Sequence, residues 1–183
     1  MILVLGSGES GVGSALLAKS KGLSVFVSDS SLIEKNYKEL LLKNDIQFEE
    51  NGHVQANKLN VDYVIKSPGI PDTAAIIKQL TNKQTQIISE IEFASKFTDA
   101  TIIGVTGSNG KTTTTTIIYE ILKSENIDVD IAGNIGVSFA SKIVASNSKN
   151  YVLELSSFQL DGIIDFNPHI AIMTNLSPDH LDR

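Results

Sequence analysis

The sequence predicts an α/β protein: a Rossmann-like parallel-sheet unit followed by a second α/β unit of the phosphate-loop type. Met1 to Leu5 is a continuous apolar run that leads into a Gly-x-Gly-x-x-Gly loop at Gly6–Gly11 and then into a helical pattern. Thr101 to Ile103 is a β-branched run that leads into a glycine-rich turn at Gly104–Gly110 and a second helical pattern. Uninterrupted apolar strands of this kind are typical of parallel sheets that are covered on both faces.

Composition limits the classes of protein to which the chain can belong. Its 183 residues are 42% hydrophobic and 20% charged, as in ordinary globular domains, and no apolar run approaches the ~20 residues that span a bilayer. The chain has no cysteine, and its apolar start has no basic segment before it, so we expect neither disulfides nor a signal peptide and predict a cytoplasmic protein. The net charge is −6 and the lysines are scattered, which argues against a nucleic-acid surface.

The first glycine loop begins a predicted βαβ unit. A helix through Ala15 to Ala18 ends at Gly22, and Leu23 to Asp29 forms the second strand. Asp29 follows Gly11 by 18 residues, close to the ~20-residue offset of the acid that binds ribose in dinucleotide folds. These residues are consistent with a crevice that binds a nicotinamide dinucleotide. They are equally consistent with a loop whose glycines serve only a tight turn.

The remainder of this unit contains one further candidate contact region. We predict a helix over about Leu32–Lys43 and a strand over Val61–Lys66, which leads into Ser67-Pro68-Gly69. Ser67 and Gly69 are candidate ligand contacts because the carboxyl ends of parallel strands face the ligand crevice, although an ordinary Pro-Gly turn explains the same residues more simply. A short strand and helix around Ile87–Phe93 complete the unit. We place the boundary in the segment 96–100, which gives domains at 1–97 and 98–183.

The second glycine loop predicts phosphate binding. Glycines let backbone N–H groups point at an anion, the helix that follows adds positive potential, Lys111 would reach terminal phosphates and Thr112 would offer a hydroxyl to magnesium. The common pattern G-x-x-x-x-G-K-[ST] would put its first glycine at position 105, where this chain has Val105. The alternative is a Gly-Asn-Gly turn that merely precedes a helix.

Further strands would bring polar side chains to the same edge of the second sheet. We predict strands over 129–132, 151–157 and 169–174, and a helix over 138–145. Glu154 lies within an otherwise apolar strand, and its carboxylate is the kind of hard oxygen ligand that magnesium prefers. His180 follows Ser177 at a predicted helix start, where it is a metal ligand, an acid or base, or an exposed first-turn residue. We assign no role to His53 or His169.

Several sequence blocks, taken together, resemble one enzyme family. Gly107 to Thr112, Gly133 to Gly136, Glu154 to Leu160 and Ser177 to Arg183 have the order and spacing of the Mur ligases, the ATP-dependent amino-acid-adding enzymes of peptidoglycan synthesis. The Glu-Leu-Ser-Ser-Phe-Gln-Leu block at 154–160 is most similar to the D-glutamate-adding branch. The glycine loop at 6–11 and Ser67-Pro68-Gly69 are similar to the first domain of that branch.

The resemblance implies a reaction and a set of site residues. The substrates would be ATP, D-glutamate and UDP-N-acetylmuramoyl-L-alanine, with Mg2+ as the metal and an acyl phosphate as the intermediate. The catalytic residues would be Lys111, Glu154 and His180, and the metal ligands would be Thr112, Glu154 and His180. ATP would contact Gly107, Ser108, Asn109, Gly110, Lys111, Thr112 and Thr113. The UDP-linked substrate would contact Gly8, Glu9, Ser10, Asp29, Ser30, Ser67, Gly69, Asn134, Ser156 and Gln159.

The resemblance also implies that this sequence covers only part of a three-domain enzyme, because it stops within the central domain. We therefore expect no ligase turnover from these 183 residues alone. A partial central sheet would expose an unpaired strand edge, so we expect self-association, whereas the parent enzyme would be a monomer. A sibling ligase for another amino acid, a binding module for a UDP-linked ligand and a nicotinamide oxidoreductase are the alternatives.

Overall fold

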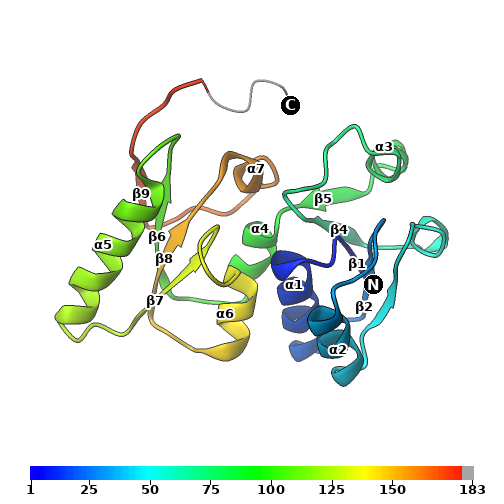
Figure 1. The fold of residues 1–183 in the computed structure, drawn as a ribbon, viewed down its shortest axis with the longest axis horizontal. Helices are drawn as coiled ribbons and strands as arrows, with labels where there is room; N and C mark the ends of the chain where they lie inside the picture. Colours follow the sequence, from blue (N-terminus) through cyan, green and yellow to red (C-terminus); the bar gives the residue numbers. More distant parts are fainter. Residues whose placement is uncertain (179–183) are drawn as a thin grey trace.

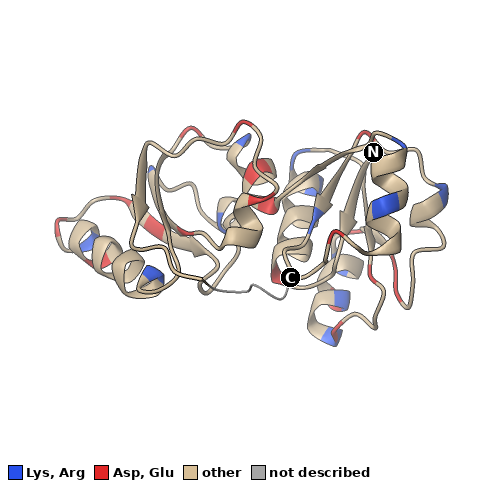
Figure 2. Cartoon of the chain, turned by 90° about the horizontal axis from the view of Figure 1, so that it is seen from above, with Lys and Arg blue, Asp and Glu red and all other residues tan. Residues whose placement is uncertain are grey.

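The computed structural model describes residues 1–178, which form two parallel β-sheets with helices packed on their faces (Figure 1). The mixed α/β class that the sequence predicts is confirmed. No helix in the described part of the chain is both long enough and apolar enough to cross a membrane. Lysine and acidic residues are distributed over the helices and loops of both units (Figure 2).

The first sheet has five parallel strands in the order β3-β2-β1-β4-β5. The strand order reverses between β1 and β4, so the glycine loop after β1 and the Ser67 turn after β4 lie at a topological switch point, where ligands bind in open α/β sheets. The strands are β1 (Ile2–Leu5), β2 (Val25–Ser28), β3 (Gln47–Glu49), β4 (Tyr63–Lys66) and β5 (Gln86–Ile88). The helices are α1 (Glu9–Ser20), α2 (Lys35–Lys43), η1 (Ala56–Lys58), α3 (Ala75–Asn82) and α4 (Glu90–Ser95).

The second sheet has four parallel strands in the order β7-β8-β6-β9. Because β6 lies between β8 and β9, the loop that follows β6 opens onto the carboxyl ends of both neighbours. The strands are β6 (Thr101–Thr106), β7 (Val129–Gly133), β8 (Asn150–Glu154) and β9 (Ile170–Met173). The helices are α5 (Lys111–Ser124), α6 (Phe139–Ala145) and α7 (Ser157–Leu160).

The alternation of side chains along β1 explains why its whole sequence is apolar. Ile2 and Val4 pack into a core shared with α1, while Leu3 and Leu5 pack into a second core with α3 on the opposite face. Both faces are therefore covered, as expected for a parallel sheet. The first core continues through α1, α4 and α6 into the second sheet, so one apolar cluster joins the two units.

The contact between the units depends on a close helix approach and on three carboxylates. Gly13 of α1 faces α6 so closely that an added Cβ would lie 2.3 Å from Ser138 Oγ. Glu9 accepts the Ser138 N–H at 3.0 Å, and Glu90 accepts the Ala140 N–H at 2.5 Å, so both carboxylates from the first unit meet the start of α6. These bonds satisfy N–H groups that a helix start leaves without an intrahelical partner.

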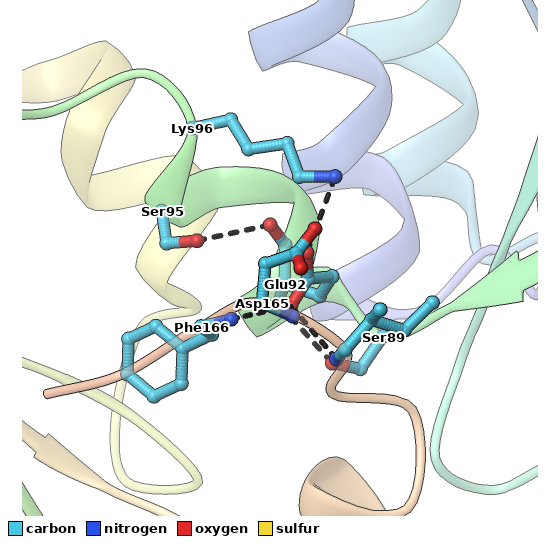
Figure 3. A network of polar contacts seen from close by, with 7 residues as sticks. Ser89, Glu92, Ser95, Lys96, Asp165 and Phe166 are labelled. Atoms are coloured by element: carbon cyan, nitrogen blue, oxygen red, sulfur yellow. Dashed lines mark hydrogen bonds and ion pairs between the residues drawn. The ribbon is translucent and has the colours of Figure 1, made fainter.

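Glu92 forms the third contact between the units, two residues after Glu90 in the first turn of α4. Its Oε2 accepts the backbone N–H groups of Ile164, Asp165 and Phe166 at 2.9–3.0 Å, and Lys96 lies 3.1 Å from its Oε1 (Figure 3). Burial alone would raise the pKa of Glu92, but these donors outweigh it and lower the pKa. The side chain is thus an ionised anchor for the loop before β9.

Two predicted element boundaries are wrong, and four short elements were not predicted. Helix α2 begins at Lys35 and not near Leu32, because the Ile33 N–H is bonded to Glu50 Oε2. Strand β8 ends at Glu154, because Ser156 starts the short helix α7. Strand β3 and the helices η1, α3 and α7 have no counterpart in the sequence prediction. β3 has only three residues and is partly exposed, so its apolar signal is weak.

Candidate functional site

The loop after β6 requires glycine at the positions where its backbone turns. Gly107 has φ 132°, and a Cβ there would lie 2.2 Å from Thr174 Oγ1; Gly110 has φ 80° and is the N-cap of α5. Both angles are in the region that favours glycine. Val105, at the position where the common pattern has its first glycine, lies fully buried inside β6. The departure from the pattern therefore falls in the strand and not in the turn.

The loop is held against the end of β9 by side chains that the sequence analysis did not single out. Asn175 Oδ1 accepts the Asn109 N–H at 3.0 Å, and Asn175 Nδ2 donates to Asn109 O at 2.8 Å. Thr174 Oγ1 also donates to Asn109 O, at 2.6 Å. The Lys111 ammonium folds back over the turn and donates to Gly107 O at 2.6 Å and to Ser108 O at 3.0 Å.

Glu154, Thr112 and Asn134 form a polar cluster beside this loop. Thr112 Oγ1 donates to Glu154 Oε2 at 2.6 Å, and Asn134 Nδ2 donates to Glu154 Oε1 at 2.8 Å. Only 3% of Glu154 is exposed, so these bonds compensate the cost of burying a carboxylate at the end of β8. The start of α5, the end of β8 and the turn after β7 are separate in the sequence and meet in this cluster.

A cavity of about 590 Å³ opens beside this cluster and reaches into the first unit. Its wall includes Lys111, Asn134 and Ser156, all predicted site residues, together with Gly69 from the turn after β4. The remaining lining residues are Pro68, Thr106, Gly107, Ser108, Ser157, Phe158, Leu160, Met173, Leu176 and Ser177. The volume is within the range of small-molecule sites.

A second cavity of about 350 Å³ lies at the switch point of the first sheet. Gly69 lines it too, together with Asp29 and Ser30 and with Gly6 of the glycine loop. Asp29 holds the loops around it, because its Oδ2 accepts both the N–H and the hydroxyl of Ser7, and its Oδ1 accepts the Ser31 N–H. His53, to which the sequence analysis assigned no role, also lines this cavity.

Some predicted contact residues lie outside both cavities. Glu9 points to Ser138 and therefore bridges the two units. Gly8 is the N-cap of α1, and the Ser10 carbonyl accepts the Ser14 hydroxyl within that helix. Ser67 Oγ is buried without a hydrogen-bond partner. A Cβ at position 6 would lie 2.5 Å from this oxygen, which explains why position 6 is a glycine.

The short helix α7 adds a structural explanation for two predicted residues. Ser156 accepts the Gln159 N–H and Gln159 Oε1 accepts the Ser156 N–H at 3.0 Å, which is a capping box. The spacing Ser-x-x-Gln is the sequence signal for this box, and the strand prediction overlooked it. Ser156 still lines the larger cavity. His180 lies outside the described residues.

Together, the fold and the site define a two-unit parallel α/β protein with a nucleotide-loop geometry. Comparison with known families assigns residues 105–183 to the Mur ligase middle domain and residues 1–76 to the MurD N-terminal domain. The chain belongs to the Mur ligase family and corresponds to an N-terminal portion of its D-glutamate-adding branch.

Individual relatives support this assignment over the whole chain. It is 53% identical over 182 residues to the UDP-N-acetylmuramoylalanine--D-glutamate ligase of Bacteroides thetaiotaomicron and 54% identical to that of Porphyromonas gingivalis. All of the chain is covered in both comparisons, and it spans 41% and 40% of the lengths of these relatives.

Solved structures agree on the fold. A Neisseria UDP-N-acetylmuramate:L-alanyl-gamma-D-glutamyl-meso-diaminopimelate ligase matches 99% of this chain and 62% of its own, with a TM-score of 0.64 and 21% identity. The UDP-N-acetylmuramate-alanine ligase of Thermotoga maritima matches 99% of this chain and 42% of its own, with a TM-score of 0.58 and 24% identity.

Proposed function

We propose that this chain provides the UDP-substrate site and much of the ATP site of a ligase that adds D-glutamate to UDP-N-acetylmuramoyl-L-alanine. Residues 1–97 would hold the UDP end, and residues 98–183 would hold ATP and the reacting carboxylate. The names of the ligases to which the chain is 53% and 54% identical support this proposal. A cytoplasmic location, expected from the sequence, is part of the proposal.

The observation that carries the proposal is the position of Gly69 between the two cavities. Gly69 lines the cavity that contains Asp29 and Ser30, and it also lines the cavity that contains Lys111 and Asn134. An elongated ligand can therefore be anchored at its nucleoside end in the smaller cavity and present its other end to Lys111. A UDP-linked sugar carrying an amino acid has this shape.

The loop from Gly107 to Thr113 would bind the phosphates of ATP. Its glycines keep the backbone free of Cβ atoms beside the start of α5, where N–H groups and the helix dipole favour anions. Lys111 would exchange its bonds to Gly107 O and Ser108 O for bonds to phosphate oxygens. Its positive charge would then offset the charge that develops on the transferred phosphoryl group.

Thr112 and Glu154 fit a magnesium site, because two oxygen ligands of the kind this metal prefers lie 2.6 Å apart beside the loop. When bound, Mg2+ would neutralise phosphate charge during transfer. Asn134 would keep Glu154 oriented through its bond to Oε1. His180 is proposed as a further ligand from the family resemblance alone.

The proposed reaction has two steps, a phosphoryl transfer and an acyl transfer. The alanyl carboxylate oxygen attacks the γ-phosphorus and ADP leaves, which gives an acyl phosphate. The amine nitrogen of D-glutamate then attacks the acyl carbon, phosphate leaves with the C–O bonding pair, and the nitrogen loses a proton. Asn134 and Ser156 line the cavity in which the carboxylate would approach Lys111.

A chimera tests the proposal. Residues 1–183 would replace the matching segment of the Bacteroides thetaiotaomicron ligase, which is 53% identical, and product would be measured from ATP, D-glutamate and UDP-N-acetylmuramoyl-L-alanine. We expect turnover from the chimera, none from the 183 residues alone, and none from a Lys111→Ala chimera. Calorimetry of the 183-residue chain should show binding of both UDP and Mg-ATP. A chain that binds neither nucleotide would contradict the proposal.

A further inference from the structure

A hydrogen-bonded chain that the proposed function does not use runs from Glu49 through Ser28 to His53, and His53 lines the smaller cavity. Ser28 ends β2 and Glu49 ends β3, and the two residues are paired in the sheet register. The Ser28 hydroxyl lies 2.8 Å from Glu49 Oε1 and 2.6 Å from His53 Nδ1. Ser28 is fully buried, while His53 also lines the cavity beside Asp29 and Ser30.

The direction of the hydrogen bonds in this chain follows from the state of Glu49. Its carboxylate also accepts the N–H groups of Gln55 at 2.7 Å and Ala56 at 2.8 Å. Burial alone would raise the pKa of Glu49, but these N–H groups and the Ser28 hydroxyl outweigh it and lower the pKa. Ionised Glu49 can only accept, so the single hydroxyl proton of Ser28 is donated to it.

The tautomer of His53 is then determined. Because the Ser28 hydroxyl donates its hydrogen to Glu49, the Ser28 oxygen must accept a hydrogen bond from His53. His53 Nδ1 must therefore carry a hydrogen. In the neutral imidazole the other nitrogen, Nε2, is consequently an acceptor. Nδ1 is held against buried Ser28, so Nε2 is the ring nitrogen that is left for a ligand in the cavity.

The turn that carries His53 is itself fixed. Gly52 has φ 138° and its N–H donates to Asp29 O at 3.0 Å, and the Asn51 N–H donates to Ser31 O at 3.1 Å. The other strong acceptor in the cavity, the Asp29 carboxylate, already accepts three hydrogen bonds from Ser7 and Ser31. A carboxylate has about four acceptor positions, so Asp29 has little left to offer a ligand.

We propose that His53 is a specificity-determining residue that reads the base of the bound nucleotide, its Nε2 accepting the imide N3–H of uracil. Cytosine has an acceptor at N3, so it would place this acceptor against His53 Nε2, and two opposed acceptors leave each other unpaired at a cost in affinity. Ser28 and Glu49 are positioning residues that act through His53. This inference rests on the proposed function, because it assumes that the uridine end occupies this cavity.

Calorimetry with UDP and CDP on the 183-residue chain tests the base reading. We expect the chain to prefer UDP by about tenfold, since cytosine would leave the His53 Nε2 acceptor unpaired. His53→Ala should weaken UDP binding and reduce the preference to less than about threefold. Val54→Ala is the matched control, because Val54 is the next residue, is 67% exposed and should leave the preference unchanged.

Nitrogen NMR of the histidine rings tests the hydrogen bonds from His53 to Ser28 and from Ser28 to Glu49 before any ligand is added. We expect His53 as the Nδ1–H tautomer, with an Nε2 signal that moves on addition of UDP and not of CDP. Ser28→Ala should let the His53 ring exchange between its two neutral tautomers. It should also lower the preference for UDP over CDP while the protein still binds Mg-ATP.

The outcomes separate the two proposals. An Nε2–H tautomer in the wild type, or a His53→Ala variant that keeps the preference for UDP, would overturn the inference and leave the proposed function standing. If neither UDP nor CDP binds while Mg-ATP does, the placement of the uridine end fails, and the inference fails with it.

Discussion

Glu90 should make the free energy of unfolding depend on pH near neutrality. The side chain is 1% exposed, its Oε1 accepts the Ala140 N–H at 2.5 Å, and its Oε2 has no partner. Burial raises the pKa of Glu90 from 4.5 to about 7. The nearby charge of Glu9 also raises this pKa, whereas the hydrogen bond from the Ala140 N–H lowers it. The folded protein therefore holds a proton that the unfolded chain has lost.

The sign and size of the effect follow from linkage. Between pH 4.5 and about 7 the folded state binds more protons at Glu90 than the unfolded state, so stability falls as the pH rises through this window. Below pH 4.5 both states are protonated and the contribution of this group is constant. At 1.36 kcal/mol per pKa unit, the stability lost by pH 8 is at most about 3 kcal/mol.

Glu90→Gln tests this reasoning, because an amide has nearly the same shape and does not titrate. Urea denaturation followed by circular dichroism at pH 5, 6, 7 and 8 should show a variant that is up to about 3 kcal/mol more stable than the wild type at pH 8, with a much smaller difference at pH 5. Glu120→Gln, at an exposed position of α5, is the control. Stability curves that run parallel from pH 5 to 8 for wild type and Glu90→Gln would refute the assignment.

Three further predictions concern the loop, the interface and the sheet edge. Gly107→Ala should abolish Mg-ATP binding, measured by calorimetry, because its Cβ would lie 2.2 Å from Thr174 Oγ1; unchanged affinity would show that the turn can adapt. Glu92→Ala should lower the free energy of unfolding by about 3 kcal/mol or more in a urea titration, since three N–H groups lose their shared acceptor; a loss below about 1 kcal/mol would contradict this. The chain should self-associate through the β9 edge, and Ile170→Lys should reduce the apparent mass in light scattering, whereas a monodisperse wild-type monomer would exclude the association.

The strand–turn–helix units could be predicted from the sequence because their signals are local. The apolar residues of β1 and the glycines at 107 and 110 reflect two-sided burial and positive φ angles, which depend on the strand and turn themselves. That Glu154 has hydrogen-bond partners was also predictable, because a lone carboxylate in an apolar strand requires them. Short elements such as β3 were not, since three partly exposed residues contain too little periodicity.

Only the tertiary structure decided which polar groups are partners. Glu9 and Ser138 are 129 residues apart, and nothing near Glu9 in the sequence distinguishes a ligand contact from a bond between the two units. His53 likewise has no motif around it, and its relation to Ser28 depends on the register of β2 against β3. Hydrogen-bond partners are selected by distances of about 3 Å, and such distances between remote residues are determined by packing. The sequence thus determined the units and their loops, while the fold determined how Gly69 joins their two cavities.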